Sequence, residues 1–160
     1  MISELMNLTN NYFEKFYIHG TIKITDGKIN LPSDFLKGQY IRIINSLLND
    51  GVYKIQEKSG ELTTLSSILN DEEFTGFVVG LAVPKTFEDL SVSIDEWNTK
   101  NKNRKGLSSE SSLGGYYSWS ANAKNVEEAF SSEIAQYKRP IGSGNTMAFI
   151  KYARCVNGRN

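Results

Sequence analysis

The sequence predicts an α+β protein, in which a small antiparallel sheet or partly closed barrel (about 16–83) precedes two main helices (about 85–103 and 122–139). In the first half of the chain, apolar residues alternate with polar ones, which is the period of a half-buried strand. After residue 84 they recur every three or four positions, the period of one helix face. A length of 160 residues, with 39% apolar and 22% charged side chains, fits a single globular domain.

A tight hairpin is expected at Asp26-Gly27, a dipeptide that strongly favours a two-residue turn between strands. Isoleucines alternate with polar residues between positions 18 and 24, and residues 28–31 continue the apolar face on the returning strand. Ahead of this hairpin, residues 2–8 favour a short helix, because their apolar side chains fall on one side.

A second hairpin is expected in the next part of the chain. Its two strands, 39–44 and 52–55, are rich in aromatic and β-branched residues, and the connection between them ends in Asn-Asp-Gly, a turn signal. Residues 61–65 favour another short strand. Residues 74–83 are almost continuously apolar, which is typical of a strand buried on both faces. These strands complete the predicted sheet or partly closed barrel.

Two amphipathic helices are expected after the sheet. The first, over 85–103, has an apolar face formed by Phe87, Leu90, Ile94 and Trp97. Basic residues crowd its end at 100–105, either because cations suit a helix C-terminus and solvent or because they contact DNA. The second, over 122–139, stops before Pro140, and its apolar stripe is formed by Val126, Phe130, Ile134 and Tyr137. We expect Trp97 and Phe130 to be buried anchors of the core.

Two further segments carry apolar side chains without a strong signal for an element: the Ser/Gly-rich loop 106–121 and the C-terminal arm 141–160. Bare aromatic rings are costly in water and are enriched at the cores of protein interfaces, so these side chains are candidate interface residues. They are Tyr116, Tyr117, Trp119, Met147, Phe149, Ile150 and Tyr152. Either the two segments become ordered only against a partner, or they fold back onto their own domain.

No arrangement of side chains points to catalysis, a cofactor or a metal. His19 is the only histidine, and neither an orienting acid nor a nucleophile is marked for a triad. Adjacent carboxylates such as Glu72-Glu73 are better explained by solvated faces, because neighbouring acids do not face each other across a cleft. Cys155 is the only cysteine, which excludes an internal disulfide and a cysteine zinc site. We therefore expect no enzyme, no catalytic residue, no cofactor and no metal.

The charge balance also restricts the partners. The 18 basic and 18 acidic residues cancel, whereas a dedicated nucleic-acid binder usually carries a positive excess. Tyr40 and Tyr53 could form a stacking platform for bases in a small barrel, although packing within the sheet is the commoner role. No apolar run has the length of a membrane span or of a signal peptide, so we expect no membrane partner and a protein used in a cytoplasm.

Three segments resemble small proteins encoded beside the capsid and portal genes of tailed bacteriophages and prophages of Gram-positive bacteria. They are GQYIRIINSLLNDGVYKI at 38–55, FTGFVVGLAVPKTFEDLSVSIDEWNTK at 74–100 and SLGGYYSWSANAKNVEEAFSSEIAQYKRP at 112–140. The shared pattern is a glycine before a strand, an Asn-Asp-Gly-Val-Tyr turn, a Pro-Lys helix start, a Gly-Gly-Tyr loop and a final amphipathic helix. Such proteins are identified as head–tail connectors, that is, adaptor, stopper or head-completion subunits. The resemblance leaves 141–160 without a counterpart.

The resemblance implies a structural virion protein that forms a ring and joins the portal of the DNA-filled head to the tail. Its partners would be further copies of itself, the portal protein and neighbouring neck or tail proteins. Genomic DNA would pass through the channel without sequence-specific binding, which suits a chain of zero net charge. The location would be the head–tail junction, assembled in the host cytoplasm. The alternatives are a tail-side neck or terminator protein, a small-barrel nucleic-acid-binding module, or an enzyme of another kind.

Overall fold

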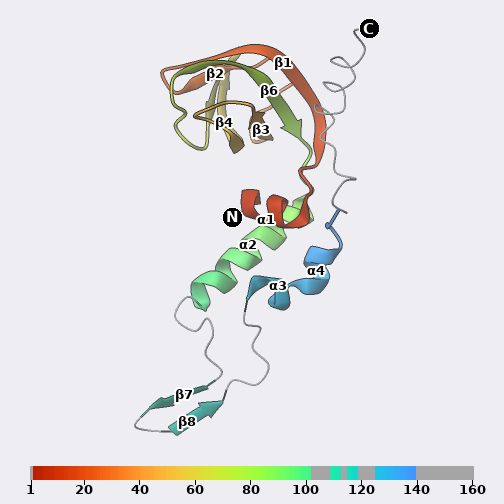
Figure 1. The fold of residues 1–160 in the computed structure, drawn as a ribbon, viewed down its shortest axis with the longest axis vertical. Coiled ribbons are helices and arrows are strands. Elements are labelled where there is room, and N and C mark those ends of the chain that lie inside the picture. Colours follow the sequence, from red (N-terminus) through yellow and green to blue (C-terminus); the bar gives the residue numbers. More distant parts are fainter. Residues whose placement is uncertain (1, 102–108, 113–114, 119–124, 140–160) are drawn as a thin grey trace. The chain divides into compact units, whose positions relative to one another are not determined.

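A computed structural model describes residues 2–101, 109–112, 115–118 and 125–139 (Figure 1). The expected single domain is built from two compact units. The barrel unit comprises residues 12–83, and the helical unit comprises the described residues within 1–11 and 84–140. The chain is therefore α+β, as the sequence predicts.

Six strands close into a barrel in the order β1-β2-β5-β4-β3-β6 (Figure 1). Their bounds are β1 Glu14–Thr25, β2 Lys28–Asn30, β3 Tyr40–Ile44, β4 Gly51–Ser59, β5 Leu62–Leu65 and β6 Glu72–Leu81. All neighbours pair antiparallel. The long strand β1 closes the barrel because it has a partner on each side: Ile24 lies opposite Ile29 of β2 and Glu72 of β6. The predicted sheet or partly closed barrel is thus a closed barrel.

The barrel interior confirms the predicted strand patterns. In β1, Ile22 and Ile24 are buried while Thr21 and Lys23 are exposed, which is the predicted alternation. In β6, every residue from Gly76 to Leu81 is buried, as expected for a strand covered on both faces. The core comprises Ile22, Ile24, Ile29, Leu31, Phe35, Ile41, Ile43, Ile55, Leu65, Leu69, Phe74 and Val78.

The turn between β1 and β2 has the predicted geometry. Asp26 has φ 52° and Gly27 has φ 68°. A two-residue hairpin turn of type I′ needs positive φ at both central residues. Asp and Gly are among the residues that adopt these values at lowest cost. The backbone N–H of Gly27 also donates to Asp71 Oδ1 at 3.1 Å, which ties this turn to the loop before β6.

The helical unit contains α1 Ile2–Thr9, α2 Lys85–Lys100, α3 Val126–Ala129 and α4 Ser131–Ala135. The first two helices match the predictions closely. The buried apolar side chains of the helical unit are Leu5, Met6, Phe87, Leu90, Ile94 and Ile134. Two hydrogen bonds fasten the chain after α4 to the chain around the end of α1: Asn11 donates to the Tyr137 carbonyl at 3.1 Å, and the Arg139 N–H donates to the Thr9 carbonyl at 2.9 Å.

The helix predicted over 122–139 is wrong as a single element. Residues 125–139 form two short helices, because the backbone leaves the helical region at Phe130, where φ is −122° and ψ is 27°. Ser131 and Ser132 follow this break, and serine hydroxyls compete with the backbone for its hydrogen bonds. Val126, Phe130, Ile134 and Tyr137 are all at least partly buried, as their spacing predicts, but this burial does not require one unbroken helix.

The described part of the Ser/Gly-rich loop forms two paired strands rather than irregular chain. Strand β7, Ser109–Ser112, pairs antiparallel with β8, Gly115–Ser118. Tyrosine favours strands, so Tyr116 and Tyr117 are a sequence signal for the second of them. The backbone of Tyr116 and Tyr117 lies in β8.

The other interface candidates fall outside the part of the chain that the structure describes. They are Trp119, Met147, Phe149, Ile150 and Tyr152. The basic residues at 102–105 lie outside it as well, so the choice between solvent and DNA for this cluster stays a prediction.

Candidate interaction surfaces

Two connections of the barrel unit are fastened to each other, and we call them the loop pair. They are residues 45–50, between β3 and β4, and residues 66–71, between β5 and β6. The Asn49 side chain bridges them in both directions. It donates to the Asn70 carbonyl at 3.0 Å and accepts from the Asn70 N–H at 2.8 Å. The buried Asn49 therefore acts as a clamp between the two loops.

Glu72, the first residue of β6, holds the first of these loops. Its carboxylate accepts from Ser46 Oγ at 2.6 Å and from Asn49 Nδ2 at 2.8 Å. It also accepts from the backbone N–H groups of Leu47 at 2.8 Å and Leu48 at 3.3 Å. The Ser46 hydrogen bond, followed by the bonds to Leu47, Asn49 and Leu48, lowers the pKa of this carboxyl below its ordinary value, because these donors favour the charged form.

The loop pair presents apolar side chains to solvent. Leu47 is 90% exposed, Ile68 is 94% exposed and Leu48 is 55% exposed. Single exposed apolar residues are common, but these three lie in loops whose backbone is held by several hydrogen bonds. Loops that are already ordered lose little conformational entropy when a partner binds. The loop pair is therefore our first candidate surface.

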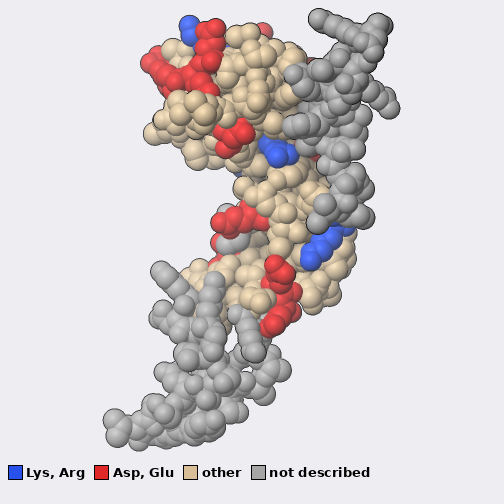
Figure 2. Space-filling view, in the orientation of Figure 1, with Lys and Arg blue, Asp and Glu red and all other residues tan. Residues whose placement is uncertain are grey.

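Carboxylates accompany these apolar side chains. Asp50 and Asp71 belong to the loop pair and Glu73 follows it, and all three are exposed. Figure 2 shows acidic side chains gathered over the barrel unit. These carboxylates disfavour DNA phosphates and anionic lipid, and they favour a surface that carries Lys or Arg.

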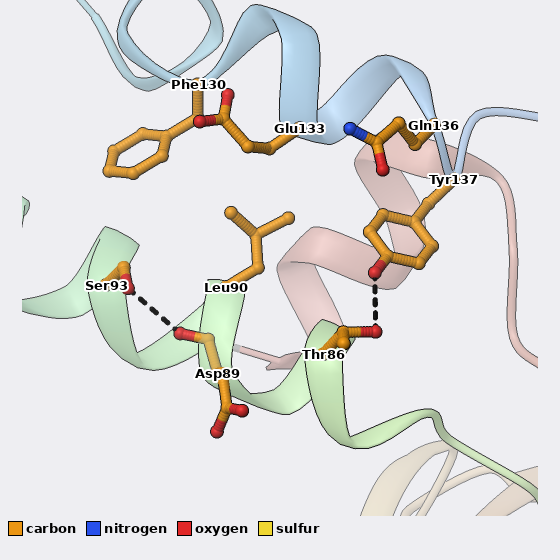
Figure 3. Close-up of a pocket in the computed structure, with 8 residues that line it drawn as sticks. All are labelled: Thr86, Asp89, Leu90, Ser93, Phe130, Glu133, Gln136 and Tyr137. Carbon is orange, nitrogen blue, oxygen red and sulfur yellow. Dashed lines mark hydrogen bonds between the residues drawn. The ribbon is translucent and has the colours of Figure 1, made fainter.

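The helical unit has a pocket of about 310 Å³ between α2 and the α3–α4 segment (Figure 3). Its lining residues are Thr86, Asp89, Leu90, Ser93, Phe130, Glu133, Gln136 and Tyr137. Leu90 points from α2 toward α4, and the Tyr137 hydroxyl is hydrogen-bonded to Thr86 Oγ1 at 2.7 Å (Figure 3). Asp89 and Glu133 belong to the lining of the pocket, but the Asp89 carboxylate points away from Leu90 and is paired with Lys85 at 2.9 Å (Figure 3). The pocket is our second candidate surface.

Tyr40 and Tyr53 do not form a common stacking platform. Tyr40 lies opposite Lys54, whose ammonium is 4.9 Å from its ring centre, whereas Tyr53 lies opposite Ile41. Successive residues of a strand point to opposite faces, so the two rings are on different sides of the barrel wall. Tyr53 packs against the core, and its hydroxyl donates to the Asn49 carbonyl at 3.1 Å. Burial, and then the nearby Asp50, raises the pKa of this phenol.

The sequence pattern predicts a turn at 45–51 and does not identify the loop pair as a surface. The one signal for it is Leu47-Leu48, because two adjacent leucines are unusual within a turn. His19 is exposed and lies against Phe77, with 4.4 Å between ring centres.

Within the described residues, no group of His, Cys, Asp or Glu is placed to hold a metal ion. No helix among them is long and apolar enough to span a membrane. Comparisons of the chain with protein-family models, with curated proteins and with solved structures find no match.

Proposed function

We propose that this protein is a non-catalytic structural subunit of a tailed bacteriophage, which forms the ring of a head–tail connector between portal and tail. Two lines of evidence support the proposal. Three sequence segments resemble connector proteins over roughly residues 10–140. The observation that carries it structurally is the loop pair, where hydrogen-bonded loops hold Leu47 and Ile68 almost fully exposed.

The loop pair is suited to a permanent protein contact. A hydrogen-bonded loop presents its apolar side chains in one arrangement, so that little ordering cost opposes their burial. The acidic residues Asp50 and Asp71 define the partner: a neck protein with an apolar hollow edged by Lys or Arg. The same residues repel nucleic-acid phosphates, which suits a subunit beside a DNA channel.

Labelled virions test this proposal. Particles produced by the source strain would be purified, treated with a gold-labelled antibody against the chain and viewed by electron microscopy. We expect label at the head–tail junction. Particles from a strain with the gene deleted are the control, and we expect them to be unlabelled heads without attached tails. Label on the tail tip or capsid surface, or normal particles without the gene, would contradict the proposal.

A further inference from the structure

The apolar part of the loop pair is small. Leu47 is 90% exposed, Ile68 is 94% exposed and Leu48 is 55% exposed, so the three side chains together offer roughly 150–300 Å² of apolar surface. A stable interface between two proteins buries about 800 Å² on each partner, and a little more than half of that area is apolar. The loop pair of one copy therefore supplies only part of the apolar surface that a stable contact needs.

Within the described barrel unit, no other large apolar side chain enlarges this surface. Leu36 and Leu62 are the remaining ones that are strongly exposed. Leu36 precedes the start of β3 and Leu62 is the first residue of β5, whereas the loop pair follows the ends of the same two strands. The two leucines therefore lie toward the opposite ends of these strands.

The rest of the loop pair is polar. Its other exposed residues are Asn45, Asp50, Ser66, Ser67, Asn70 and Asp71. Charged pairs at an exposed contact add little affinity, and they mainly select the partner and speed the encounter. The carboxylates of Asp50 and Asp71 thus define which surface fits, but they do not make up for the small apolar area.

The hydrogen bonds of the loop pair fix how each copy presents its apolar side chains. Asn49 joins the two loops, and Glu72 holds the N–H groups of Leu47 and Leu48. Every copy therefore offers the same arrangement. Several weak contacts reinforce one another only when their geometry allows them to form at the same time, and identical surfaces satisfy this condition.

We infer that one loop pair binds its partner only weakly, and that the partner is an oligomer that presents one apolar hollow, edged by Lys or Arg, to each of several copies of this chain. Linked copies bind such a partner together, because each bound copy raises the local concentration of the next. Linking two sites in this way strengthens binding by about 10²–10⁴-fold without any new contact. The inference rests on the proposed ring and names the kind of partner that its loop pairs fit.

A pair of fusions that differ only in valency tests the inference. One carries the full-length chain behind a two-stranded coiled coil and a Gly/Ser linker. The other has polar residues at the a and d positions of the same segment, so that it stays monomeric. The probes are tailless heads and free tails, purified separately from a phage strain that lacks the gene. The measurement is the amount of fusion that sediments with each probe as its concentration is raised.

We expect the monomeric fusion to half-saturate heads or tails only above about 100 µM, because contacts this small are transient. The dimeric fusion should half-saturate the same particles at a concentration at least about a hundredfold lower. Leu47→Ser with Ile68→Ser should abolish this gain. The matched control is Leu36→Ser with Leu62→Ser, which removes exposed leucines of the same unit and should leave the gain unchanged. Equal half-saturation of the two fusions, or no retention of either, would overturn the inference.

A second measurement uses the chain without any fusion. Wild type and the Leu47→Ser with Ile68→Ser variant are expressed together, in varied proportions, in cells infected by the phage that lacks the gene. The titre should fall more steeply than the wild-type fraction, because a mixed ring loses several contacts at once. A fall in proportion to that fraction, or a slower one, would show that single loop pairs suffice.

The outcomes separate this inference from the proposed function. Tight retention of the monomeric fusion by heads or tails would overturn the weak, repeated contact and leave the connector proposal standing. Retention that depends on valency, in a protein that labelled virions do not show at the head–tail junction, would do the reverse.

Discussion

At the scale of single residues, Glu72 shows how one carboxylate can hold a loop whose leucines, Leu47 and Leu48, are exposed. Its oxygens accept from a side-chain hydroxyl, from a side-chain amide and from two consecutive backbone N–H groups. Without Glu72, the N–H groups of Leu47 and Leu48 would lose these acceptors, and the loop would depend on the bonds of Asn49 and on the bond from the Ser46 N–H to Asp50. Hydrogen bonds to a charged acceptor are stronger than those between neutral groups, which suits this task.

We predict that Glu72→Gln lowers the urea midpoint of unfolding at neutral pH, since the amide replaces a charged acceptor. The pKa of Glu72 is lowered below 4.5 in the folded protein, so its stabilising effect is present above pH 4.5 and is lost as the pH falls through the folded pKa. The difference between variant and wild type should therefore shrink in acid. Glu73→Gln, the exposed neighbour, is the control and should change little. A difference that stays constant down to pH 2 would contradict this role.

Residue-level patterns predicted the barrel interior well and the loop pair poorly. Burial of Ile22 and Ile24 follows from the period of the strand, because each face of a strand has one environment. Leu47 and Ile68 have no such periodicity, and an apolar residue in a loop is equally compatible with burial under that loop. The loops are held by hydrogen bonds of Glu72 and Asn49 to residues more than twenty positions away, and the sequence pattern does not show such bonds.

At the scale of elements, helix packing corrects one expectation about anchors. Trp97 and Phe130 are partly buried rather than core residues, and their rings meet edge to face with centres 6.4 Å apart. Phe87 is the fully buried aromatic of α2, at 0% exposure. The apolar stripe identified the contacting faces of the helices correctly. How deeply each member lies depends on the break at Phe130, which periodicity does not show.

The contact between these two rings can be measured with a double-mutant cycle. We predict that Phe87→Ala costs ~3–5 kcal/mol in the free energy of unfolding, and that Trp97→Ala and Phe130→Ala each cost less. The coupling between Trp97 and Phe130 should be about 0.5–1.5 kcal/mol, the range for an edge-to-face pair. Trp97→Ala combined with Val92→Ala is the control and should be additive, because Val92 is exposed. Zero coupling between the rings would show that α3 does not pack on α2 as described.

At the scale of the whole molecule, the residues that stabilise the fold differ from those that we propose to contact a partner protein. The barrel core and the helical core are filled by buried side chains, whereas Leu47 and Ile68 contribute almost nothing to either because they are exposed. A double variant Leu47→Ser with Ile68→Ser should therefore change the free energy of unfolding by no more than about 0.5 kcal/mol per site. If the loop pair is an assembly surface, the same variant should lose function.

The measurement is complementation of a phage that lacks the gene, with a plasmid-borne copy of the chain. We expect Leu47→Ser with Ile68→Ser to lower the titre of infectious particles at least about tenfold, because two side chains that exclude water from the contact are lost. The matched control is Leu62→Ser with Val92→Ser, two exposed apolar residues outside the loop pair, and it should complement like the wild type. Equal titres for the two double variants would show that exposure at the loop pair serves no contact. Loss of titre together with a lower unfolding midpoint would instead place these side chains in the fold.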